Sequence, residues 1–130
     1  MSARAAAVSA AIAGMLAVAL GAFAAHALRG QLSAEQLITW RIAVDYQFWH
    51  ALALFGVSVW MRQASSMGKQ HSRSLSIAAI AFTIGLVLFS GSLYALALGA
   101  PRGIGIITPF GGVAFIIGWS AMLVTAWRYR

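Results

Sequence analysis

Residues 75–98 read LSIAAIAFTIGLVLFSGSLYALAL, a stretch without any Asp, Glu, Lys or Arg. A helix needs about 20 apolar residues to cross a hydrocarbon core of about 30 Å. The nearest charged residues, Arg73 and Arg102, lie beyond the two ends of the stretch. An ionised side chain at mid-depth in a bilayer costs roughly 3 kcal/mol or more. The stretch therefore predicts a membrane-spanning helix.

The rest of the chain follows the same pattern. No charged residue occurs inside Arg4–Arg29, Asp45–Arg62, Arg73–Arg102 or Arg102–Arg128. Water-soluble domains are about 25% charged, whereas this chain of 130 residues is 8% charged and 62% hydrophobic. We therefore predict an all-α fold, an integral membrane four-helix bundle in a single domain covering 1–130. The expected spans are about 7–27, 44–62, 75–98 and 106–127.

The first apolar run has a second interpretation. Arg4, an Ala-, Leu- and Val-rich run and the small residues at 22–25 resemble a secretory signal peptide. The run is longer than the 7–15 residues typical of such a hydrophobic region, and its removal would leave three spans. A retained first span is the favoured interpretation.

The distribution of basic residues predicts the orientation. The net charge of +7 fits the positive-inside rule and anionic lipid headgroups better than it fits nucleic acid. Six basic residues fall on one side of the membrane and three on the other. We therefore expect a multi-pass protein of the bacterial inner (plasma) membrane with both termini in the cytoplasm. The six are Arg4, Arg62, Lys69, Arg73, Arg128 and Arg130, and the three are Arg29, Arg41 and Arg102.

The segments between spans carry helix signals. Ser33, followed three residues later by Gln36, forms a capping-box pattern, and no Gly or Pro follows until Gly56. We expect a short amphipathic helix at about 33–43, between spans 1 and 2, that bends into the second span. Whether this helix lies on the outer membrane surface or is continuous with the second span stays open at this point. Residues 63–74 should form a polar cytoplasmic linker.

The ends of the last two spans are also marked. Gly99, followed by Pro101, should end the third span in a left-handed conformation. Thr108 as N-cap and Pro109 as first helical residue should start the fourth span, which leaves residues 103–107 as a non-helical approach.

Small residues predict where helices approach closely. Ala10, Gly14, Ala17 and Gly21 share one face of the first span, and helices in lipid associate through such faces. The glycines expected at helix-packing positions are Gly14, Gly21, Gly91, Gly111 and Gly118.

Polar residues within the spans gather in the predicted outer half of the membrane. His50 is the deepest ionisable residue among them, and intramembrane ionisable groups are candidates for function. A neutral His50 that ties helices together is the favoured interpretation, and a role in ligand binding or proton transfer is the alternative. The candidate polar pocket comprises His26, Asp45, Tyr46, Gln47, His50, Ser90, Ser92, Tyr94 and Thr108.

These residues do not form a known catalytic or metal-binding motif. His26 and His50 lack HxxxH or HExxH spacing, so haem or metal ligation is a weak hypothesis. Asp45 and His50 point about 140° apart on a straight helix, which argues against a triad with Ser90 or Ser92. The chain has no cysteine, which removes thiolate chemistry. We expect no catalytic residues, no metal site and no cofactor.

Four stretches together resemble a known family. They are GAFAAHAL (21–28), AVDYQFWHALAL (43–54), FSGSLYALAL (89–98) and ITPFGGVAFIIGW (107–119). The combination resembles the small four-span inner-membrane family of unknown function typified by bacterial YgdD, which has a vertebrate mitochondrial relative. Ala24 stands where that family usually has glycine, and Asp45 where polar, often uncharged, residues are common.

The resemblance implies a four-helix inner-membrane protein without implying an activity. Its matching residues largely coincide with the outer-half polar residues. They are His26, Tyr46, Gln47, His50, Ser90, Gly91, Ser92, Tyr94, Thr108, Pro109 and Gly111.

Two hypotheses about function follow. The favoured one is a non-enzymatic accessory, assembly or scaffold subunit, whose partners are the lipid bilayer and either a larger membrane complex or further copies of the chain. The alternative is a lipid, quinone or small-solute binding or transport protein that uses the polar pocket. No nucleic-acid partner is expected.

Overall fold

The computed structural model describes residues 1–68 and 72–128, and it consists of helices joined by short turns. Four of its helical segments are long and apolar enough to cross a membrane. The first is α1 (Ala3–Phe23) with η1 (Ala24–Leu28), and the second is α2 (Ala34–Ser66). The third comprises α3 (Arg73–Gly85), η2 (Leu86–Ser90) and α4 (Gly91–Ala97). The fourth comprises η3 (Arg102–Ile106) and α5 (Ile107–Arg128).

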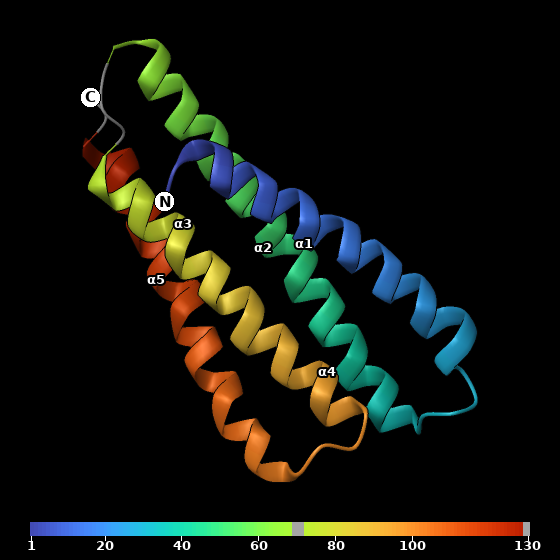
Figure 1. The fold of residues 1–130 in the computed structure, drawn as a ribbon. Coiled ribbons are helices and arrows are strands. Elements are labelled where there is room, and N and C mark those ends of the chain that lie inside the picture. Colours follow the sequence, from blue (N-terminus) through green and yellow to red (C-terminus); the bar gives the residue numbers. More distant parts are fainter. Residues whose placement is uncertain (69–71, 129–130) are drawn as a thin grey trace.

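The four segments run antiparallel to their neighbours along the chain (Figure 1). The N-terminus, the C-terminal ends of α2 and α5 and the start of α3 lie at one end of the molecule. The turns α1–α2 and α4–α5 lie at the other end. α1 packs along α2, α2 also contacts the third segment, and α5 packs against the third segment. The expected all-α bundle is confirmed.

Serine side chains cap three helix starts. Ser2 Oγ accepts a hydrogen bond from the Ala5 backbone N–H, and Ser72 Oγ accepts one from Leu75. Ser33 and Gln36 form the reciprocal capping box that the sequence predicts, at 3.2 and 2.8 Å. These bonds satisfy backbone donors that have no partner within the helix.

The third segment ends where the sequence predicts. Gly99 has φ +93°, and its N–H donates to the Leu96 carbonyl at 3.0 Å. A side chain at this φ would be strained, so glycine stops the helix.

Residues 33–43 do not form an interfacial helix of their own but are continuous with the second span, the alternative that the sequence left open. Residues 33–43 belong almost entirely to α2, one helix of 33 residues and about 50 Å in length. No Gly or Pro interrupts the sequence in this region. Trp40 is only 3% exposed because it packs against Leu28 and Ala97, so the segment lies on protein rather than flat on the membrane.

Two further boundaries differ from the predictions. Residues 102–106 form a 3-10 turn, and α5 already begins at Ile107, so Thr108 is not an N-cap. Pro109 is tolerated in the first helical turn because an N–H there has no intrahelical acceptor. The 63–74 linker is shorter than expected because α2 continues to Ser66 and α3 begins at Arg73; residues 69–71 lie outside the described part.

The buried face of α2 forms the centre of the fold. Its residues recur at alternating intervals of four and three, as one side of a helix requires. Large apolar side chains of the same helix, including Phe48, Leu52 and Phe55, are exposed on the other faces, as expected toward lipid. The buried series is Ala43, Gln47, His50, Leu54, Val57, Met61 and Ala64.

Candidate functional site

Gln47 joins three helices. Its Nε2 donates to the carbonyl oxygen of Ala13 in α1 at 2.8 Å, and its Oε1 accepts from the Tyr94 hydroxyl in α4 at 2.7 Å. The side chain is 6% exposed. An amide or hydroxyl left without a partner in an apolar interior costs roughly 2–7 kcal/mol. The two bonds avoid this cost for the buried Gln47 amide and the Tyr94 hydroxyl. Through Gln47, the two bonds link α2 to α1 and to α4.

Trp40 supports this junction from the side of the α1–α2 turn. Its indole N–H donates to the Leu20 carbonyl at 3.0 Å. Its ring meets the Tyr94 ring edge-on, with the centroids 4.7 Å apart. Edge-to-face aromatic pairs add about 0.5–1.5 kcal/mol to the energy of burial. The indole is thereby fixed between α1 and α4.

His50 is held in one neutral tautomer by its two neighbours. Nδ1 lies 2.7 Å from the Tyr46 carbonyl oxygen, which can only accept, so Nδ1 carries the proton. Nε2 accepts from the indole N–H of Trp119 at 3.3 Å. A protonated Nε2 would face another donor there. Phe115 stacks on the imidazole with centroids 3.5 Å apart and planes 10° apart.

The hydroxyl groups of the third segment bridge to α2 and α5. Ser90, the last residue of η2, donates to the Ala43 carbonyl at 2.9 Å. The Ser92 hydroxyl shares a 2.7 Å hydrogen bond with that of Thr108. Helices in lipid gain specificity from such bonds, each worth about 0.6–2 kcal/mol. Among the predicted pocket residues, Gln47, His50, Ser90, Ser92, Tyr94 and Thr108 all bond across or along helices, and Tyr46 stacks on Phe89.

His26 and Asp45 do not join the other predicted pocket residues, and that part of the prediction is wrong. Both side chains are exposed. Asp45 lies midway between Ala43 and Gln47, about 200° around the helix from each, and therefore on the opposite face of α2. His26 lies in η1, in which only Leu28 is buried. Seven of the nine predicted pocket residues therefore pack or bond within the protein, and two have exposed side chains. The nine do not line one cavity.

The predicted packing glycines divide into two groups. A Cβ at Gly111 would overlap the backbone of Phe89, and one at Gly118 would lie 2.6 Å from the Phe82 ring. A Cβ at Gly21 would contact Val44 at 3.4 Å. At Gly14 and Gly91 no such neighbour lies within 4 Å, so these two are not points of close approach.

Sequence reasoning missed the aromatic partners and one glycine. Phe115 and Trp119 surround His50, and a Cβ at Gly85 would overlap the Phe115 ring. Phe115 and Trp119 are four residues apart and therefore lie on one face of α5. This spacing was visible in the sequence and could have indicated that both rings contact the same neighbour. The π-turn η2, which lies between α3 and α4, has no comparable signal in the sequence.

The interior of the described chain contains no spare polar group. Every buried side-chain nitrogen or oxygen in that part of the chain has a hydrogen-bond partner. No group of three or more His, Cys, Asp or Glu side chains is placed to hold a metal ion within residues 1–68 and 72–128. The arrangement therefore supplies helix-to-helix bonds, and its buried polar groups are engaged in them.

Comparison with known proteins assigns the family. Residues 20–112 match the family described as "Protein of unknown function (DUF423)". The chain is 44% identical over 119 residues to the UPF0382 membrane protein YwdK of Bacillus subtilis (strain 168), covering 92% of this chain and 93% of the relative. It is 41% identical over 121 residues to the UPF0382 inner membrane protein YgdD of Escherichia coli (strain K12), covering 93% and 88%. The chain belongs to the DUF423 family.

The assignment confirms the resemblance carried by the four sequence stretches. The DUF423 chain is a small multi-pass membrane protein of a family whose activity is unknown. The matched region contains all the predicted pocket residues but ends before Phe115 and Trp119. No solved structure matches the chain.

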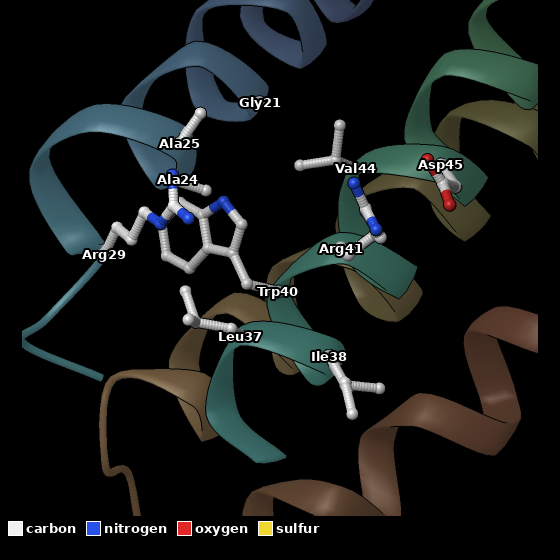
Figure 2. Close-up of a pocket in the computed structure, with 10 residues that line it drawn as sticks. All are labelled: Gly21, Ala24, Ala25, Arg29, Leu37, Ile38, Trp40, Arg41, Val44 and Asp45. Atoms are coloured by element: carbon white, nitrogen blue, oxygen red, sulfur yellow. The ribbon is translucent and has the colours of Figure 1, made fainter. Parts of the chain in front are cut away.

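A groove of the DUF423 chain lies between α1 and α2, near the turn that joins them. It has a volume of about 530 Å³ (Figure 2). Of the predicted pocket residues, it includes only Asp45. Arg29, Arg41 and Asp45 supply its charges, and all three side chains are exposed. The other lining residues are Gly21, Ala24, Ala25, Leu37, Ile38, Trp40 and Val44.

Proposed function

We propose that this DUF423 chain is a non-enzymatic accessory, assembly or scaffold component of the bacterial inner membrane. The observation that carries this proposal is that the interior polar groups form hydrogen bonds within the protein. Gln47, His50 and Tyr94 each bond to another helix or to a backbone carbonyl, and none of them lines the α1–α2 groove. A catalytic or transport site needs polar groups that remain available to substrate.

The outer surfaces support association as the function. α1 packs mainly along α2, so most of its circumference is free of other helices of the chain. That free surface combines small residues such as Ala11 and Ala22 with large apolar ones such as Met15 and Val18. Helices associate in lipid by close van der Waals packing, which small residues permit. We infer that α1 is the side that meets a partner or a second copy.

Extraction with the surrounding lipid in polymer nanodiscs, followed by native mass analysis, tests this proposal. The expected particle contains more than one copy of the chain or an additional protein. The variant Ala11→Phe should reduce the particle to one chain, because a ring on the exposed face of α1 blocks close approach. The matched control is Val113→Phe on the exposed face of α5, which should leave the particle unchanged. A single partnerless chain in the unsubstituted protein would contradict the proposal.

The alternative, a ligand site built from Tyr46, Gln47 and His50, gains no support from the geometry. Tyr46 stacks on Phe89 with centroids 4.6 Å apart, and His50 stacks on Phe115. These rings fill the space that a quinone or solute would need.

A further inference from the structure

We propose that the α1–α2 groove is a binding site for the headgroup of one anionic phospholipid, with the phosphodiester held between Arg29 and Arg41. This inference is independent of the proposed function, because it concerns a different surface.

The groove lies at the depth of the lipid headgroups. Asp45 and Arg62 are 17 positions apart with no charged residue between them, or about 25 Å of α2, close to the thickness of the hydrocarbon core of about 30 Å. Asp45 therefore lies near one boundary of that core, and Arg41 lies one turn farther out. Arg29 follows directly after the last residue of η1, at the same end of the molecule. The charged part of the groove thus faces the headgroup layer.

Small residues on one wall and a fixed ring on the other keep the groove open. Gly21, Ala24 and Ala25 form the α1 side. Trp40 belongs to the α2 side, and its ring is held by the bond to Leu20 and the contact with Tyr94. A volume of about 530 Å³ is within the range of about 300–1,000 Å³ typical of small-molecule sites.

The charges of the groove select the class of lipid. Two guanidinium groups and one carboxylate leave a net charge of +1. One phosphodiester with an otherwise uncharged headgroup, as in phosphatidylglycerol, neutralises that charge. Arginine pairs with phosphate through two parallel N–H donors, and basic pockets between membrane helices bind anionic headgroups. A zwitterionic lipid adds an ammonium group and leaves the net charge in place.

Native mass analysis of the full-length chain in mild detergent tests the site. Phosphatidylglycerol, phosphatidylethanolamine and phosphatidylcholine of identical acyl chains are titrated separately, and the fraction of protein with one bound lipid is measured. Phosphatidylglycerol should saturate one site at the lowest concentration. R29Q and R41Q should each weaken its binding about fivefold or more, because each removes a charge-assisted pair. R102Q removes an exposed arginine at the same end of the molecule but outside the groove, and should change little.

Two further variants distinguish binding in the shaped groove from a general electrostatic attraction between the protein and anionic lipid. A25L fills the groove without changing its charge and should abolish the single bound lipid. D45N raises the net charge to +2 and should strengthen phosphatidylglycerol binding. Thermal unfolding of each variant confirms that it remains folded. Equal binding of the three lipids, an R102Q effect as large as that of R41Q, or retained binding in folded A25L would overturn the proposal.

Discussion

At the scale of single residues, the positions of the polar side chains were readable from the sequence but their partners were not. Gln47 and Tyr94 stood out because few polar groups occur inside the spans. Their bond joins residues 47 positions apart, and the bond from Gln47 to Ala13 spans 34 positions. Such pairings depend on how whole helices pack, and no local pattern encodes them.

The bond between Gln47 and Tyr94 predicts non-additive substitutions. Q47L leaves the Tyr94 hydroxyl buried without its acceptor and should lower the free energy of unfolding by about 1–3 kcal/mol. Q47L combined with Y94F removes both partners and should cost less than the sum of the two single changes. Reversible unfolding in bicelles measures the four proteins. Strict additivity would contradict a direct bond.

The geometry around His50 predicts its tautomer. Nitrogen NMR of the labelled imidazole should show a protonated Nδ1 and an unprotonated Nε2, because Tyr46 offers an acceptor and Trp119 a donor. W119F should shift the Nε2 resonance and leave that of Nδ1 nearly unchanged. The account of this contact is wrong if Nε2 carries the proton in the unsubstituted protein.

At the scale of elements, local signals predicted helix ends better than helix continuity. The capping box at Ser33 and the stop at Gly99 act within one helical turn, so the sequence contains all of their parts. Thr108 resembled an N-cap, but its hydroxyl bonds to Ser92 on the neighbouring helix. The sequence left open whether residues 33–43 lie on the membrane surface or continue the second span, and the burial of Trp40 within the protein accompanies the continuous helix. Tertiary contacts decided both cases.

The close approach of α5 to the third segment predicts which glycines tolerate a methyl group. G111A and G118A should each lower the free energy of unfolding by about 1–3 kcal/mol, because the added Cβ overlaps the Phe89 backbone or the Phe82 ring. G14A is the matched control. It meets no neighbour within 4 Å and should be neutral or stabilising by up to about 1 kcal/mol. Equal destabilisation by all three changes in thermal unfolding would contradict this packing.

At the scale of the whole molecule, the charge pattern was enough to predict an all-α membrane bundle. Four segments without charges leave few other folds, because every backbone polar group in lipid must be bonded internally. The order of packing, with α2 in contact with both α1 and the third segment, was not predictable from that pattern.

The bias in basic residues predicts the orientation, which reporter fusions measure. A fluorescent protein fused after the C-terminus should fold and fluoresce, because that end is expected in the cytoplasm. A periplasmic phosphatase inserted after Gly30, in the α1–α2 turn, should be active. The opposite pattern would reverse the orientation and place the Arg29–Arg41 groove in the inner leaflet.

The central claim is that the interior polar groups hold helices together and do not bind a non-lipid ligand. Native mass analysis of the protein in polymer nanodiscs, compared with the Q47L/Y94F double variant, tests it most directly. We expect the same protein composition for both and no bound molecule other than lipid. A single chain that carries a non-lipid molecule, which is lost in the folded double variant, would contradict the claim.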